Sequence, residues 1–296
     1  MKVLKLFFLP LIFFLFSPRI YSQLFYDNQP YTYEFGVGVS AMNCITDLGG
    51  ANTETKYYFN EIKFKNFRAS GSVYASVTYY DFLSAKLQAS WGSVRSADSD
   101  IKGNSITAVY KRNRNLSFRS NIAEVSLLFD FYPLKLIKLQ ESEWVVDPYL
   151  TAGLGLFTFN PQTQYNGNWI DLKPLHTEGE GFPEYPAVSN YGLTKAEIPL
   201  GIGVKYNLSS KLNLRLEYLH RVLFTDYLDD ASSQKFVNPD VFDKNLPPAS
   251  AAAARDLFNR SINGRTPPRR GNPDNNDTYM SLSLKVGIVL GRDYKP

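Results

Sequence analysis

The residues of this 296-residue chain that could do chemistry are charged side chains spaced through apolar segments. Within these segments the apolar residues keep to every second position and the charges fall between them, although the alternation is weaker in the glycine-rich segment 148–159. Since a strand turns successive side chains to opposite faces, these charges should share one face and could pair as salt bridges there. Four acids face four bases, which predicts a side-chain-filled interior rather than an open channel. The eight residues are Glu34, Lys86, Glu124, Glu197, Lys205, Arg215, Glu217 and Lys285.

Catalytic chemistry has little support in the sequence. His176 and His220 are the only histidines. A serine with either histidine and a glutamate could form a lipid hydrolase or acyltransferase site, but a single histidine among polar loop residues is more often solvated. No phosphate-binding glycine loop and no metal-ligand spacing is present. We therefore predict a protein that is not an enzyme and has no cofactor.

Two acidic clusters could offer oxygen ligands to Ca²⁺. One contains Asp226, Asp229 and Asp230, and the other runs from Asp274 to Asp277. Capping of turns by Asp and Asn side chains is the favoured interpretation, so no metal site is predicted. The exposed pair Arg269–Arg270 could meet lipopolysaccharide or the carboxylates of a partner.

The elements that must position these charges are eight short segments with an apolar period of two. The last is the clearest, with Leu282, Leu284 and Val286 alternating with Ser283 and Lys285. A pattern of this kind predicts strands with one apolar and one polar face. The predicted strands span 31–41, 69–80, 84–93, 121–132, 148–159, 195–206, 211–221 and 280–290.

The connections between these segments alternate in length. Short or intermediate ones cover 81–83, 133–147 and 207–210, whereas the other four are long. With an even number of strands, all the short connections fall at one end. This is the pattern of an all-β, antiparallel, transmembrane outer-membrane barrel with short periplasmic turns and long extracellular loops. A soluble sheet with charges scattered over a water-facing surface is the alternative, but it gives no reason for the segregation.

The N-terminus predicts export. Two lysines precede an apolar run from Leu6 to Phe16, and a polar exit follows, as in a secretory signal peptide cleaved near Ser22 and Gln23. Residues 23–296 are then expected to form a single barrel domain in the bacterial outer membrane. Removing three basic residues takes the net charge from +4 to +1, which gives no case for nucleic acid as a partner. Cys44 is the only cysteine, so no disulfide can form within the chain.

Several motifs carry a family resemblance. They include 146–155, 175–181 and 198–203, then Asn259–Ser261 and Arg270–Pro273. The most specific is Phe224, Thr225, Asp226, Tyr227, Leu228, Asp229 and Asp230. In this order the motifs resemble a Bacteroidota family of outer-membrane barrels that includes the PorG-type component of the type 9 protein secretion and gliding machinery. His176, and the residues that follow Asp230, depart from the family pattern.

The resemblance implies an accessory or anchoring role in secretion, with a periplasmic ring protein or lipoprotein as partner and outer-membrane lipid and lipopolysaccharide as surroundings. The periplasmic turns would make the contact, with Lys135, Lys138, Glu141 and Glu143 as a polar docking rim. A surface-exposed binding or adhesin-like barrel acting through its outer loops is the alternative. A lipid-modifying enzyme and a small porin are weaker hypotheses, and the charged interior argues against the porin.

Overall fold

The computed structural model describes residues 30–49, 64–102, 104–136, 146–188, 190–233, 235–267 and 269–291. The expected signal peptide lies outside these residues. So do Lys138, Glu141 and Glu143 of the expected docking rim.

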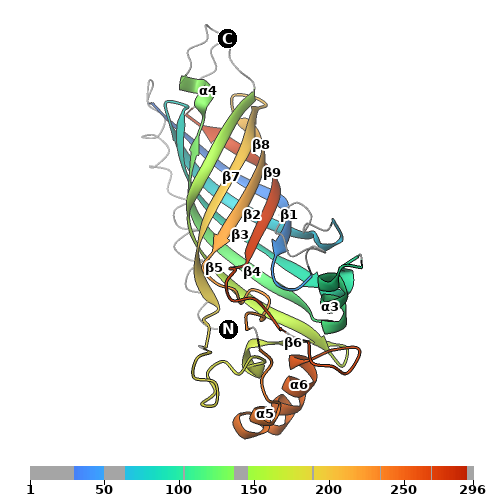
Figure 1. Cartoon of the computed structure of the whole chain (residues 1–296). Coiled ribbons are helices and arrows are strands. Elements are labelled where there is room, and N and C mark those ends of the chain that lie inside the picture. The colour runs from blue at the N-terminus through green and yellow to red at the C-terminus, as the bar shows by residue number, and fades with distance from the viewer. Residues whose placement is uncertain are drawn as a thin grey trace.

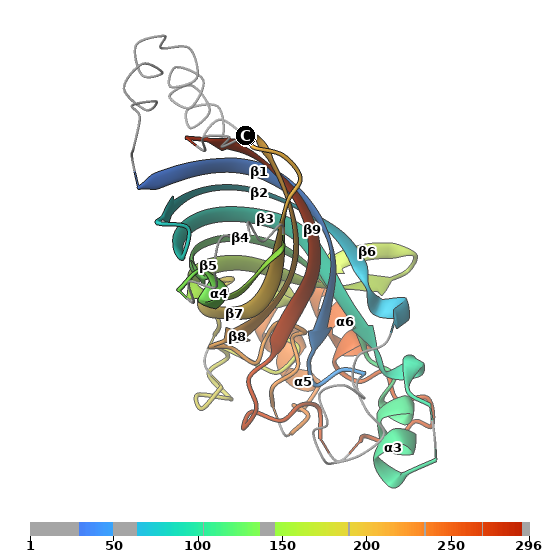
Figure 2. The same cartoon turned by 90° about the horizontal axis from the view of Figure 1, so that it is seen from above.

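Eight antiparallel strands close into a barrel, as Figures 1 and 2 show. Each strand pairs with the next along the chain, and β1 pairs with β9 to complete the ring. Closure leaves the eight barrel strands without an open edge on which backbone groups would lack partners. The predicted eight-stranded antiparallel barrel is therefore confirmed. Its strands are β1 (Tyr31–Ile45), β2 (Arg68–Tyr79), β3 (Leu83–Ala97), β4 (Ser117–Phe131), β5 (Val146–Tyr165), β7 (Thr194–Asn207), β8 (Leu212–Leu223) and β9 (Thr278–Leu290).

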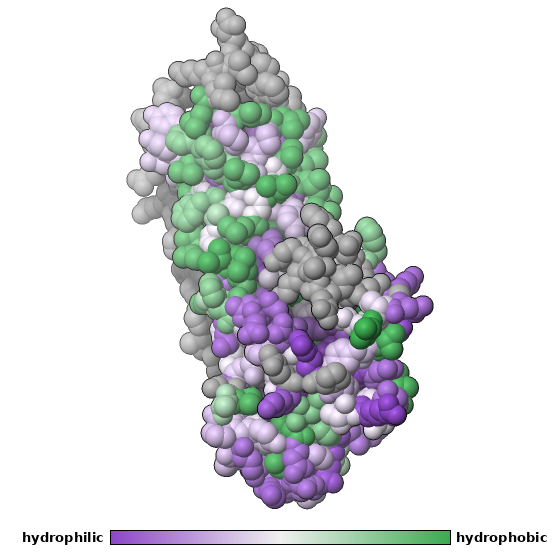
Figure 3. Space-filling view, in the orientation of Figure 1, coloured by the Kyte–Doolittle hydropathy of each residue, from purple (hydrophilic) through white to green (hydrophobic). Residues whose placement is uncertain are grey.

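The apolar positions form a belt around the outside of the barrel. Leu87, Val125 and Leu284 are 55%, 53% and 53% exposed, while their neighbours along each strand are buried. Figure 3 shows this apolar surface over the upper part of the barrel. Exposed tyrosines, among them Tyr31 and Tyr206, border it where the short turns lie. An outward apolar band edged with aromatic residues is what a lipid-facing barrel requires.

The two ends of the barrel differ. One, here called the turn end, carries 80–82, 208–211 and the connection that contains α4 (Pro133–Leu136). The other, the loop end, carries α3 (Ile106–Arg114), α5 (Asp240–Asn245) and α6 (Pro248–Phe258). No helix within the described ranges is long and apolar enough to cross a membrane.

Several strands run further into the loop end than the sequence predicts. β3 ends at Ala97, β4 begins at Ser117 and β5 ends at Tyr165. A tight turn at Asn166 and Gly167, both with positive φ, then leads into β6 (Asn168–Asp171). Asn-Gly is the signature of a two-residue hairpin turn. Treating 94–120 and 160–194 as loops throughout was wrong, because backbone pairing continues where the apolar alternation ends.

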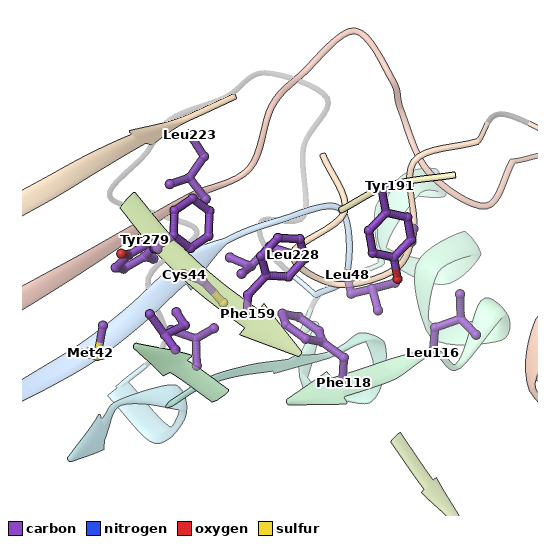
Figure 4. Packing of buried hydrophobic residues seen from close by; sticks show 14 residues of the cluster. Met42, Cys44, Leu48, Leu116, Phe118, Phe159, Tyr191, Leu223, Leu228 and Tyr279 are labelled. Atoms are coloured by element: carbon purple, nitrogen blue, oxygen red, sulfur yellow. The ribbon is translucent and has the colours of Figure 1, made fainter. Parts of the chain in front are cut away.

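The loops are packed rather than loose. One apolar cluster fills the mouth of the barrel, with Phe118, Phe159, Leu223 and Leu228 among its members (Figure 4). A second cluster lies around α5 and α6 and includes Phe242. Together the packed loops form a cap over the loop end, and this cap and the charged interior are the two places where polar side chains gather.

Candidate functional site

Arg215 is the centre of the interior charge network. Its Nη2 and Nε donate to the Glu34 carboxylate at 2.7 and 2.8 Å, and its Nη1 donates to Asp130 at 3.2 Å. Tyr132 accepts a further bond from Nη1 at 2.8 Å. The Arg215 side chain is 0% exposed. Each hydrogen bond that the buried guanidinium donates offsets part of the free-energy cost of removing the charged group from water.

Two lysines complete the central cluster. Lys86 Nζ lies 3.0 Å from Asp130 Oδ1 and 2.6 Å from Glu217 Oε2, and Lys285 donates to the other oxygen of Glu217. Tyr149 also donates to Glu217, at 2.8 Å. Three acids (Glu34, Asp130, Glu217) thus face three bases (Arg215, Lys86, Lys285), and the cluster is formally neutral. A neutral, fully bonded network can stay dry inside the barrel.

A second cluster lies nearer the loop end. Arg221 donates to both oxygens of Glu124, at 2.9 and 3.1 Å. The Tyr279 hydroxyl lies between two carboxylates, 2.7 Å from Glu124 and 2.6 Å from Glu197. Ser126 donates to Glu197 at 3.1 Å. This geometry joins β4, β7, β8 and β9 across the barrel.

The turn end holds the last of the eight expected charges. Lys205 lies 3.9 Å from Asp147 and 4.2 Å from the centre of the Tyr132 ring. Asp147 also pairs at 2.9 Å with Lys135, whose side chain is partly exposed. Lys135, expected on the docking rim, therefore neutralises an acid at the turn end of the barrel.

All eight expected residues are buried in the interior, where they bond to several partners outside the expected set of charges. Asp130 and Arg221 alternate with apolar residues in the same way as the expected interior charges, and this pattern could have identified them. The interior tyrosines Tyr74, Tyr132, Tyr149 and Tyr279 could not, since tyrosine also occupies the outward face. Tyrosine serves inside because its ring fills space and its hydroxyl bonds to a carboxylate.

The segment from Phe224 to Asp230 lies in the cap, where Asp229 bonds to backbone groups. Asp229 accepts hydrogen bonds from the amides of Leu48 and Ala231, at 2.9 and 3.0 Å. Asp277 accepts from the amide of Leu228 at 2.9 Å. These acids hold three separate loops together. Their carboxylates cap backbone amides, as the favoured interpretation of the acidic cluster expects.

Asp230 and Arg270 anchor the other side of the cap. Asp230, in the left-handed region with φ 63°, accepts bonds from the hydroxyls of Thr177 and Tyr191, both at 2.6 Å. Arg270 donates to Glu178 at 3.1 Å and to Thr177 at 2.6 Å. Arg270 is buried, so the expectation that both arginines of the 269–270 pair are exposed was wrong for it.

The remaining motif residues have packing roles. Phe224 is exposed on the outside, and Leu228 belongs to the apolar cluster at the mouth. Tyr227 stacks on Tyr191 with ring centres 4.3 Å apart, and Thr225 accepts a bond from the amide of Tyr227 at 3.3 Å. The motif therefore shapes the cap.

Asp226 differs from its neighbours. It is 6% exposed, and neither carboxylate oxygen has a hydrogen-bond partner within 3.5 Å. Burial, followed by the charges of Asp47 and Asp229, raises its pKa to about 10. Burial and Asp47 likewise raise the pKa of Asp229 to about 7. In the part of the chain that the structure describes, no three or more His, Cys, Asp or Glu side chains are grouped so as to hold a metal ion.

The cap is expected to loosen as the pH rises. Burial raises the pKa of Glu178 to about 8 and that of Glu180 to about 9. A carboxyl whose pKa is higher in the folded state binds its proton more tightly there, so its stabilising effect is full below about pH 4 and is lost towards the folded pKa. Cleavage of the cap by a protease should therefore be several-fold faster at pH 9 than at pH 6, after correction with an unstructured peptide.

Glu180→Gln supplies the matched control for this effect, because the raised pKa of Glu180, about 9, is reached at the upper pH of the comparison. The amide cannot ionise, so the variant should show a flatter pH dependence than the parent. Identical corrected cleavage rates at the two pH values in the parent would contradict the assignment of raised pKa values to the cap acids.

The two histidines lie in different settings. His176 Nδ1 is 2.6 Å from the backbone oxygen of Glu180, and its ring packs 5.1 Å from that of Phe182. His220 is half-buried on the outward side of β8. His176 is thus engaged by the backbone and an aromatic ring, as in a loop anchor.

Comparison with known proteins adds no family. No protein family profile and no curated protein sequence matches the chain. Among solved structures, Ail of Yersinia pestis aligns over 88% of this chain and 100% of its own, with 8% identity and a TM-score of 0.37. Neisserial surface protein A gives 11% identity, 88% and 97% coverage and a TM-score of 0.36.

A major outer membrane protein of Thermus thermophilus gives 15% identity, 87% and 99% coverage and a TM-score of 0.34. Similarity at this level carries no argument about function. The architecture rests on the strand pairing: the chain is a closed eight-stranded antiparallel barrel with an apolar belt outside, a charged interior and a packed cap at one end.

Proposed function

We propose that this protein is a non-enzymatic scaffold of the bacterial outer membrane. The apolar belt supports this proposal most directly, because leucines and valines more than half exposed in water would be costly over so large a surface. The neutral interior supports a structural role, since each of its central charges already has a partner. In this placement the turn end faces the periplasm and the loop end faces outward.

The finer proposal is an anchoring role in type 9 secretion, and it rests on the resemblance of the motifs to the PorG-type family. The barrel would fix a periplasmic ring protein to the membrane through its turn end. Of the expected docking rim, Lys135 is held by Asp147 and keeps part of its side chain exposed. A partly exposed, fixed charge suits docking, because little side-chain freedom is lost on contact.

Photo-cross-linking in intact membranes tests this role. A photoreactive residue at Lys135 should capture a periplasmic protein of the secretion ring, which mass spectrometry identifies. The same residue at Lys244, exposed in α5 at the loop end, is the matched control and should not capture it. Cross-links from Lys135 to lipid or peptidoglycan alone would contradict the anchoring role.

A binding or adhesin-like barrel is the second candidate, and the packed cap favours it. Buried hydrogen bonds that Asp229 and Asp230 accept and that Arg270 donates give the loops a fixed shape, and a fixed surface loses little entropy when it binds. The position of harmful substitutions distinguishes the two functions. Substitutions at the turn end would abolish an anchoring role, whereas substitutions on the cap surface would abolish a binding role.

A further inference from the structure

Two arginines lie directly opposite each other on neighbouring strands. Arg95 of β3 and Arg119 of β4 are cross-strand partners in the barrel ladder. Both occupy the parity of the exposed residues Trp91 and Val125, so they belong to the outward face. Like charges in this position repel each other and destabilise a sheet unless an anion lies between or over them.

The two arginines have no acidic partner in the described part of the chain, since no ion pair within 4.0 Å joins Arg95 or Arg119 to a carboxylate. Arg119 is held in place by Gln162 at 2.9 Å and by the Trp169 ring at 3.9 Å. Arg68, at the start of β2, has the parity of the buried Ser72 and Tyr74 and is not part of this outward pair. Arg95 and Arg119 are here called the arginine rim.

The height of the arginine rim matches a membrane surface. Leu83 begins the exposed apolar face of β3 at the turn end, and Trp91 ends it. Arg95 is twelve residues beyond Leu83, which is about 30 Å along the barrel axis at about 3.3 Å per residue and a tilt of about 40°. A lipid-facing band is about 25 Å tall, so Arg95 should lie just beyond it, at the headgroups.

Aromatic side chains flank the arginine rim on the outside. Phe64, in the single turn η1 (Phe64–Asn66) just before β2, is highly exposed, as is Trp91 below Arg95. Aromatic residues together with arginine are the side chains that suit the boundary between hydrocarbon and polar headgroups. The rim is therefore continuous with the apolar belt.

We propose that the arginine rim binds the phosphate groups of an outer-leaflet glycolipid of the lipid A type. Guanidinium groups take phosphate oxygens through paired hydrogen bonds, and two opposed arginines match a headgroup with more than one phosphate. The acyl chains of the same lipid would cover the apolar belt beside β3 and β4. This inference rests on the membrane placement proposed above.

Thermal unfolding of the full chain in detergent tests the assignment. Bis-phosphorylated lipid A at ten times its apparent Kd should raise the midpoint by about 3 °C. The double variant Arg95→Gln/Arg119→Gln should lose most of this shift, and Arg95→Gln alone about half. Without lipid the double variant should unfold close to the parent, because the relief of repulsion between the arginines offsets the loss of the contacts of Arg119 with Gln162 and Trp169.

The controls separate the possible sources of the effect. Lys244→Gln/Arg265→Gln removes the same charge from exposed loop positions and should keep the full shift. Dephosphorylated lipid A should give little shift. An undiminished shift in the double variant, or an equal shift with inorganic phosphate alone, would overturn the proposal. A parent protein with no folded, heat-modifiable gel band and no membrane association would instead refute the membrane placement itself.

Discussion

Replacing Arg215 by glutamine should lower the free energy of unfolding by about 3–5 kcal/mol. The substitution removes the cation paired with Glu34, which keeps hydrogen bonds from Tyr74 and Asn213, and one of the two cations paired with Asp130. Both carboxylates stay buried in the interior, and a buried carboxylate without a counter-charge costs far more than the net value of the pair that it lost. Urea unfolding of the refolded barrel in lipid vesicles, followed by circular dichroism, measures the change.

The double variant Glu34→Gln/Arg215→Gln is the matched control. It removes both charges of the pair, and Asp130 keeps Lys86 at 3.0 Å. It should therefore recover a substantial part of the stability that Arg215→Gln loses, giving a coupling energy above about 1 kcal/mol. A single variant within about 1 kcal/mol of the parent would show that the network is hydrated or open.

Replacing Leu284 by arginine should cost about 2–4 kcal/mol in a bilayer and shift most of the protein to the unfolded band on a heat-modifiability gel. Leu284 lies in the middle of β9, between Val39 on one side and Leu216 on the other, and all three side chains are exposed in the apolar belt. An arginine there would face hydrocarbon with no carboxylate on that face to receive it.

Leu284→Phe is the matched control for this change. It keeps an apolar side chain on the same face and should fold to nearly the same extent as the parent. If the arginine variant folds as well as the phenylalanine variant, the face that carries Leu284 is in contact with water, and the membrane placement is wrong.

The barrel can be predicted from the sequence more clearly than the cap can. Alternation identifies the lipid-facing and interior positions of a strand because the two-residue period can be read within one short segment. Glu34, Lys86 and Arg215 could therefore be placed in the interior. Which acid meets which base depends on the register between strands. The pairing of Arg215 with both Glu34 and Asp130 joins residues 181 and 85 positions apart.

The cap could not be predicted for a similar reason. Asp229 bonds to the amide of Leu48, and Arg270 to Glu178, across separations that no local pattern reveals. The β5–β6 hairpin did have a local signal in Asn166–Gly167, but the apolar alternation that marks membrane strands stops before it. Strand pairing outside a membrane needs no such alternation, and this is why β3, β4 and β5 are longer than predicted.

Spin labels on the outward face test the central claim, which is that the apolar belt lies against lipid. Single cysteines replacing Val125, Leu284 and, as the control, Lys244 would be labelled in a Cys44→Ala background and reconstituted into vesicles. Collision with oxygen should dominate at the first two positions, and collision with a water-soluble nickel complex should dominate at Lys244. Equal access of the nickel complex to all three labels would contradict the membrane-embedded barrel.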